Sequence, residues 1–263
     1  MNYEEIAENR IMVLSNKGGV GKTTVAVNLA IGLAMRGCRV GLIDADITGP
    51  NVPKMLGLDE KKLKAGPNKL IEPVHIQVGP DFGIEIVSMA FIVDRDSPVL
   101  WRGPMKTSII KQFVESVRWS EMDYMIIDLP PGTGDEALSI AQLLRPNGAI
   151  VVTTPNDLAL LDAGKAVTLA RTMNVPVLGI IENMSGFSCP KCGRKLDLFL
   201  PGGAERASSR MQIPFLGRLE VDPEIVCSGD RGRPFIVSGT SKASKSLDAI
   251  IDLVAKRACE SQG

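Results

Sequence analysis

Short apolar runs alternate with longer helical patterns along most of the chain. Several of the short runs are apolar at nearly every position, which is typical of strands that are covered on both faces. The predicted strands are Arg10–Ser15, Arg39–Asp44, Gly83–Ser88, Asp123–Asp128, Gly148–Thr153, Val175–Glu182 and Ile213–Gly217. The predicted helices between and after them are Lys22–Arg36, Pro104–Arg118, Asp135–Leu144, Leu158–Met173, Gly203–Met211 and Lys242–Ala258. This alternation predicts an α/β fold with a doubly wound, mostly parallel sheet and helices on both faces.

The chain shows no internal repeat and no linker rich in Pro, Gly or Ser, so we expect one domain over residues 1–263. The segment Glu60–Pro73 carries four lysines and two prolines, and we interpret it as a solvated loop. His75 is the only histidine, and its apolar flanks predict the edge of a strand. We assign no role to it.

Composition and net charge argue against several classes of function. The 263 residues are 44% hydrophobic and 23% charged, as in an ordinary globular protein, and 30 basic residues balance 30 acidic ones. The net charge therefore gives no reason to expect a nucleic-acid partner or an anionic membrane. In the last helix, Leu247, Ile250, Ile251 and Val254 share one face, but the polar face mixes acidic and basic residues, so we expect core packing.

Targeting and redox signals point to the cell interior. Met1–Arg10 is polar and acidic, unlike a signal peptide, and no apolar run is long enough to span a membrane. An odd count of five cysteines favours a reducing compartment over a disulfide framework. We predict a cytoplasmic location.

A glycine-rich loop between the first strand and the first helix is the strongest chemical signal. It deviates from the Walker A pattern at Asn16, where a glycine is usual, although Asn tolerates positive φ. Glycines let backbone N–H groups approach phosphates, Lys22 suits the β- and γ-phosphates, and the Thr23 hydroxyl suits Mg²⁺. The residues predicted to bind ATP are Asn16, Lys17, Gly18, Gly19, Val20, Gly21, Lys22, Thr23 and Thr24.

Aspartates follow two of the predicted strands. Ligands bind outside the carboxyl ends of strands in open α/β sheets, so Asp44, Asp46 and Asp128 are expected beside the loop. We predict that Asp128 holds Mg²⁺ through water, with Asp44 behind it. We predict that Asp46 orients the attacking water.

Cys189 and Cys192 form a Cys-x-x-Cys pair in a predicted loop. The pair fits a redox site, half a zinc site or half an iron–sulfur site. Pro190 and Gly193 do not suggest the helix start that a redox motif needs. Four-ligand sites need two more thiolates, which a second chain would supply. Cys38, Cys227 and Cys259 lack a spacing partner and are interpreted as packing or incidental residues.

These motifs occur in the order found in a known family. The blocks are the loop itself, Asp44–Asn51, Trp101–Pro104, Asp128–Asp135, Thr153–Pro155, Glu182–Ser185 and Cys189–Cys192. Together they resemble the Mrp/ApbC-type iron–sulfur cluster carrier ATPases, relatives of the MinD, ParA and nitrogenase iron-protein group, over roughly residues 8–258. The resemblance implies that Lys17 reaches a nucleotide in the partner subunit, that Asn183 recognises adenine and that Asp222 lies in the adenine-side loop.

The predicted function is therefore an ATP-hydrolysing carrier that passes a cluster to apo-proteins. Lys17, Lys22 and Asp46 are the predicted catalytic residues. A homodimer would hold one [4Fe–4S] cluster between two Cys189/Cys192 pairs, and zinc is possible in its place. The alternatives are a MinD/ParA-type positioning switch with a structural zinc and an electron-transfer ATPase like the nitrogenase iron protein.

Overall fold

The fold is built on one large sheet, seen in a computed structural model that describes residues 6–46, 49–65, 70–80, 82–91, 111, 115–189, 192–196 and 202–261. Within these residues, eight strands pair in the order β12-β9-β8-β1-β7-β2-β6-β5. They are β1 (Ala7–Leu14), β2 (Val40–Asp44), β5 (Val74–Gln77), β6 (Gly83–Ser88), β7 (Met122–Asp128), β8 (Gly148–Thr153), β9 (Val177–Glu182) and β12 (Phe215–Arg218). All neighbours are parallel except β5 and β6, so the predicted mostly parallel sheet is confirmed.

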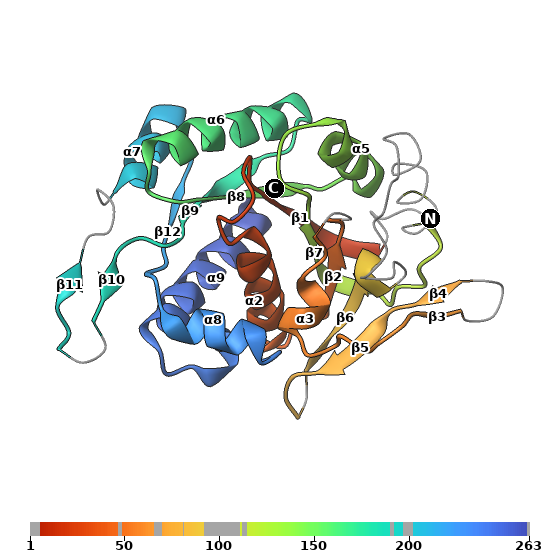
Figure 1. The fold of residues 1–263 in the computed structure, drawn as a ribbon. Coiled ribbons are helices and arrows are strands. Elements are labelled where there is room, and N and C mark those ends of the chain that lie inside the picture. Colours follow the sequence, from red (N-terminus) through yellow and green to blue (C-terminus); the bar gives the residue numbers. More distant parts are fainter. Residues whose placement is uncertain are drawn as a thin grey trace.

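Helices cover both faces of this sheet (Figure 1). One face carries α2 (Lys22–Ala34), α3 (Val52–Met55), α8 (Pro223–Asp230), the 3-10 turn η3 (Phe235–Ser238) and α9 (Lys242–Glu260). The other carries α5 (Asp135–Leu144), α6 (Asp157–Thr172) and α7 (Gly203–Met211), and the turn η2 (Met89–Phe91) follows β6. A separate apolar cluster lies on each face, which agrees with the doubly wound fold class.

The last helix packs on the core as predicted. The side chains of Leu247, Ile250, Ile251 and Val254 are all buried. Ile251 lies against Gly32 of α2, where any larger residue would collide with it. Among the described residues, no helix has the length and apolar character needed to cross a bilayer.

Strand ends differ slightly from the predicted ends, and proline explains two of them. β9 begins at Val177 rather than Val175, because Pro176 has no N–H to donate to the sheet. β12 likewise begins at Phe215, after Pro214. The edge-strand environment predicted for His75 is confirmed in β5.

Two other expectations need correction. The Glu60–Pro73 segment is not simply a solvated loop, because it contains the paired strands β3 (Lys64–Ala65) and β4 (Ile71–Glu72). The helix predicted over Pro104–Arg118 falls mostly outside the described residues, as does the Trp101–Pro104 block. Its described end is wrong, because Val117 forms a parallel bridge with Ile71 instead of continuing a helix.

Candidate functional site

The glycine-rich loop connects β1 to α2 at the carboxyl end of the sheet. Gly19 and Gly21 have φ of 78° and 87°, values that favour glycine, and Gly21 is the N-cap of α2. A Cβ placed on Gly18 or Gly19 would find no atom within 4 Å, so the space in front of the loop is open. An open glycine loop at a helix N-terminus fits an anionic phosphate group.

Asp128 forms hydrogen bonds with the side chains of Lys22 and Thr23, at the end of the glycine-rich loop. Lys22 Nζ lies 2.6 Å from Asp128 Oδ1, and Thr23 Oγ1 donates to Asp128 Oδ2 at 2.7 Å. Asp128 is completely buried at the end of β7, and Lys22 is only 6% exposed. The structure thus brings the predicted lysine, threonine and aspartate together, in an arrangement suited to phosphate and metal chemistry.

A second buried carboxylate lies beside the first. Asp44 pairs in register with Asp128 on the neighbouring strand, and its Oδ2 accepts a bond from Ser88 Oγ at 2.8 Å. Burial raises the pKa of Asp44 to about 8, and the negative charge of Asp128 adds to this effect. Burial also raises the pKa of Asp128, against the opposing influence of Lys22.

These oxygen ligands fit a magnesium ion. Mg²⁺ prefers hard oxygen ligands, and its positive charge would favour the ionised form of two adjacent buried carboxylates whose pKa values burial raises. Thr23, Asp128 and Asp44 are the residues that would hold it, directly or through water. Their roles as ligands remain predictions.

Asp46 occupies a different position, just beyond β2. Its Oδ1 accepts a bond from Gly49 N at 3.2 Å, and its own backbone N–H donates to Asp44 Oδ1 at 3.3 Å. The residue lines the same cavity as the loop. This placement is compatible with the predicted role in orienting water.

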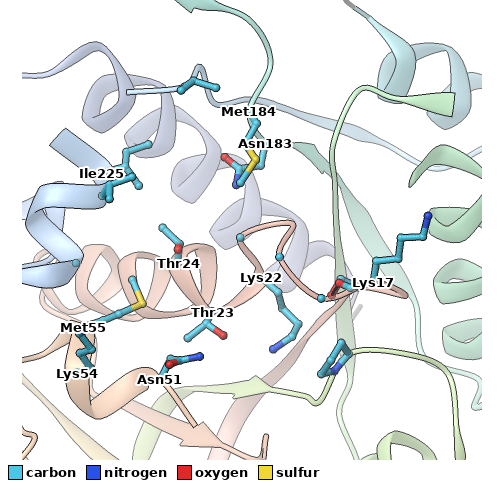
Figure 2. Close-up of a pocket in the computed structure, with 18 of the residues that line it drawn as sticks. Lys17, Lys22, Thr23, Thr24, Asn51, Lys54, Met55, Asn183, Met184 and Ile225 are labelled. Atoms are coloured by element: carbon cyan, nitrogen blue, oxygen red, sulfur yellow. Dashed lines mark hydrogen bonds between the residues drawn. The ribbon is translucent and has the colours of Figure 1, made fainter. Parts of the chain in front are cut away.

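The cavity has a volume of about 540 Å³ and two chemically distinct ends. Figure 2 shows Lys22 and Thr23 on the phosphate side, with Met55, Met184 and Ile225 around the other end. Apolar walls with a few polar groups are usual for a small-molecule site. The volume and the lining suit a nucleotide whose base lies at the apolar end.

Asn183 and Asp222 both line this cavity. Asn183 Nδ2 donates to Val20 O at 2.8 Å, so its amide supports the loop from behind. Asp222 is the N-cap of α8, where its side chain accepts a bond from Glu224 N at 2.9 Å. Recognition of adenine by Asn183 remains a prediction.

Lys17 lies apart from the other loop residues. Its side chain points away from Lys22 (Figure 2), and its Nζ is 2.9 Å from Asp162 Oδ2 on α6. Asn16 Nδ2 donates to Asp162 Oδ1 at 2.7 Å, and the hydrogen bonds from Lys17 and Lys165 lower the pKa of Asp162 to about 2. Asn16 does not use a positive φ, contrary to the expectation from its residue type; its role is the amide contact with Asp162.

Cys189 and Cys192 lie at the turn of a small hairpin formed by β10 (Phe187–Ser188) and β11 (Lys195–Leu196). Cys189 N donates to Arg194 O at 2.9 Å, and Gly193 N donates to Cys189 O at 2.8 Å. The hairpin extends from the body of the protein (Figure 1), and Cys192 is exposed.

The cysteine pair is incomplete as a metal site within one chain. All five cysteines fall within the described residues, and none forms a disulfide. The described part of the chain contains no cluster of three or more His, Cys, Asp or Glu residues that could hold a metal ion. A four-thiolate site at this hairpin therefore needs ligands from outside the chain.

Sequence reasoning missed two residues that bind predicted site residues. Ser88 binds Asp44, and its position at the end of a predicted strand was an available signal. Asp162 binds Lys17 and Asn16, but it lies 146 positions from Asn16 and no local pattern marks it.

Comparison with known proteins gives a consistent assignment. The family described as ParA, NUBPL iron-transfer P-loop NTPase, matches residues 6–255. The iron–sulfur cluster carrier protein of Pyrococcus horikoshii is 43% identical over 259 residues, which cover 97% of this chain and 88% of that protein. A cytosolic Fe-S cluster assembly factor of Saccharomyces cerevisiae is 44% identical, covering 82% of this chain and 75% of its own length.

Two proteins of known structure share the fold of this chain. A nucleotide-binding protein from Archaeoglobus fulgidus, in complex with ADP and with cobalt, is 37% identical with a TM-score of 0.76, covering 89% of this chain and 93% of its own. The septum site-determining protein MinD of Pyrococcus horikoshii, complexed with Mg-ADP, is 26% identical with a TM-score of 0.70, covering 96% and 98%. The chain therefore belongs to the ParA family of NUBPL-type iron-transfer P-loop NTPases, in agreement with the resemblance to Mrp/ApbC-type carriers that its motifs carry.

Proposed function

We propose that this protein is an ATP-hydrolysing iron–sulfur cluster carrier that binds a cluster through Cys189 and Cys192 and transfers it to apo-proteins. The observation that carries the proposal is the presence, in one chain, of a phosphate-binding loop and an exposed Cys-x-x-Cys hairpin. The names of the Pyrococcus and Saccharomyces relatives support it.

Nucleotide binding rests on the loop and on Lys22. The ammonium group of Lys22 is balanced by Asp128 at 2.6 Å, and phosphate oxygens offer it an alternative partner at the mouth of the loop. Thr23, Asp128 and Asp44 would hold Mg²⁺, which would supply positive charge beside the phosphates. The ADP complexes of two relatives support this use of the cavity.

Hydrolysis is assigned to Asp46 and the two lysines. Asp46 orients the attacking water, Lys22 stabilises charge on the transferred phosphoryl group, and Lys17 contributes from a partner subunit. Turnover by the protein alone is expected to be slow. In the single chain Lys17 is paired with Asp162, so a partner that releases this contact would stimulate turnover.

The cluster requires two chains. One chain offers two adjacent thiolates, and a [4Fe–4S] cluster generally has four cysteine ligands, so a two-fold homodimer with both hairpins on its axis completes the site. Zinc could occupy the same four thiolates, since tetrahedral sulfur sites accept it readily. We propose a cytoplasmic protein that acts on apo-protein clients and needs no nucleic acid or membrane.

A positioning switch of the MinD type is the second candidate, favoured by the likeness to MinD of Pyrococcus horikoshii. In that case the cysteine pair would hold only a structural zinc ion. A transfer assay separates the two candidates. The anaerobically loaded protein is mixed with an apo-ferredoxin, and the visible spectrum of the re-isolated ferredoxin is recorded; a carrier restores the holo spectrum, whereas a switch leaves the ferredoxin apo.

The nucleotide assignment is tested with two lysine variants. Lys22→Ala removes the charge that faces the phosphates, so calorimetry is expected to detect no ATP binding. Lys61→Ala alters an exposed lysine outside the cavity and is expected to bind ATP as the parent does. Equal ATP affinity in the Lys22 variant and the parent would refute the assignment.

A further inference from the structure

The cysteine hairpin is joined to the nucleotide cavity by a side-chain hydrogen bond. Ser188 Oγ donates to Glu220 Oε2 at 2.8 Å. Ser188 directly precedes Cys189, and Glu220 lines the cavity. This bond therefore connects the proposed cluster ligands to a wall of the nucleotide site.

Backbone contacts run beside this bond. Ser185 N donates to Leu219 O at 2.9 Å, and Val221 N donates to Gly186 O at 2.9 Å. Phe187 also forms a parallel bridge with Val221, which itself lines the cavity. The segment that leads to the cysteines therefore makes several contacts with residues 219–221.

The same segment begins in the cavity wall. Asn183 and Met184 both line the cavity, and Cys189 follows Asn183 by only six positions. Just before them, Glu182 is fully buried and accepts bonds from Ser185 Oγ at 2.5 Å and Ala204 N at 2.7 Å. The start of the segment is therefore fixed, and a ligand in the cavity meets the hairpin's two attachments, residues 183–184 and 220–222.

We propose that Ser188 and Glu220 couple the two sites, so that nucleotide in the cavity and metal on Cys189 and Cys192 change each other's affinity. Both are positioning residues, because neither is required to touch the phosphates or the metal. Coupling between two binding sites is reciprocal, and typical values correspond to about 5- to 150-fold in affinity. The metal side of this inference rests on the proposed function, since it takes the cysteine pair as the cluster site.

The side chains allow the bond to be removed and restored. Ser188→Ala and Glu220→Ala each delete it, whereas Ser188→Thr keeps a hydroxyl donor and Glu220→Gln keeps an oxygen acceptor. If the bond carries the coupling, the double alanine variant shows no greater loss than either single variant, because the two residues act as one unit.

The main test measures ADP affinity by calorimetry on the full chain, with Mg²⁺ present, before and after loading the thiols with Zn²⁺. In the parent we expect the dissociation constant of ADP to change about five-fold or more on loading. The change is expected to fall below about two-fold in both alanine variants and to persist in Ser188→Thr. A Cys189→Ser/Cys192→Ser variant serves as the control in which Zn²⁺ has no effect on ADP.

Hydrogen–deuterium exchange provides a second measurement that needs no metal. ADP is expected to change the exchange of the peptide spanning residues 186–196 in the parent and in Ser188→Thr, but not in Ser188→Ala. The coupling would be overturned if zinc changed the ADP affinity of Ser188→Ala as much as that of the parent. It would also be overturned if ADP left the deuterium exchange of residues 186–196 unchanged in the parent. A chain that shows the coupling yet never accepts iron would instead contradict the carrier function, so the two failures are distinguishable.

Discussion

Lys17 is held on Asp162, with 2.9 Å between its Nζ and Oδ2 of that carboxylate. Asp162 also accepts bonds from Asn16 and Lys165, so the first residues of the phosphate loop are tied to α6. A lysine that serves the nucleotide of a partner subunit has to leave this contact first. If Lys17 acts on a partner subunit's nucleotide as proposed, this ion pair restrains it in the single chain.

Replacing Asp162 with Asn is expected to ease ATP-dependent dimerisation. The amide oxygen can still accept from Asn16, but the ion pair with Lys17 is lost. A partly exposed ion pair contributes little to stability, so half-maximal dimerisation should need up to about five-fold less of a non-hydrolysable ATP analogue. Sedimentation velocity measures this, with Asp248→Asn, which alters an exposed ion pair on α9, as the matched control.

The pKa of Asp162 sets the pH range in which loss of this ion pair affects dimerisation. The pKa of Asp162 is lowered to about 2, so the contribution of its ion pair is present above the ordinary aspartate pKa of about 3.9 and is lost only as the pH falls toward 2. Asp162→Asn should accordingly shift dimerisation equally at pH 6 and pH 8. A variant that dimerises less readily than the parent would show that the contact is not a restraint.

Asp46→Asn is expected to separate binding from hydrolysis. The amide can still accept from Gly49 N, so the turn after β2 is retained, but the charge that we propose orients water is lost. Nucleotide affinity should stay within about three-fold of the parent, while phosphate release falls about 100-fold. Phosphate release at the parental rate would mean that a different carboxylate orients the water.

Two glycines of the loop are expected to respond differently to alanine. At Gly21, φ is 87° and a Cβ would overlap the Asn183 amide, whereas at Gly18 a Cβ meets no atom within 4 Å. The backbone strain of Gly21→Ala alone costs about 1–2 kcal/mol, which lowers Tm by several degrees. Gly18→Ala is the control and should keep the parental Tm; equal melting by calorimetry of both variants would contradict the loop geometry.

Cys38 should react more slowly with alkylating reagents than Cys192 of the Cys-x-x-Cys pair. Burial raises the pKa of the Cys38 thiol, and the charge of Asp123 adds to this, so less of the reactive thiolate is present at a given pH. At pH 8, iodoacetamide should modify Cys38 more slowly than exposed Cys192, and the difference should narrow as the pH rises. Peptide mass spectrometry follows both sites, and faster modification of Cys38 would be the opposite result.

Much of the fold could be predicted because its strands are buried on both faces and therefore read as continuous apolar runs. Leu42 and Ile43 in β2 are examples, and the aspartate that ends this strand lies at the edge of the sheet that carries the glycine-rich loop. The phosphate loop could be located for a similar reason, since its chemistry depends on consecutive residues. Asp222, followed by Pro223 and Glu224, is a recognisable start for α8 that the sequence reasoning overlooked.

Other features depend on residues far apart in the sequence. The contact of Asn16 with Asp162 joins positions 146 apart, and that of Ser188 with Glu220 joins positions 32 apart. Helical periodicity places Asp162 on a helix but does not reveal what its carboxylate meets. The two-residue strands β10 and β11 are too short to show a period of two, so the hairpin could be seen only in the folded chain.

The central claim is that two chains share one cluster through Cys189 and Cys192. Its most direct test is anaerobic reconstitution with iron and sulfide, followed by native mass spectrometry of the intact protein. The account predicts a dimer carrying four irons and four sulfides, with a visible absorption band, and an iron-free protein for Cys189→Ser/Cys192→Ser that still binds ATP. A double variant that takes up the same four irons per dimer, or a parent that takes up none, would contradict it.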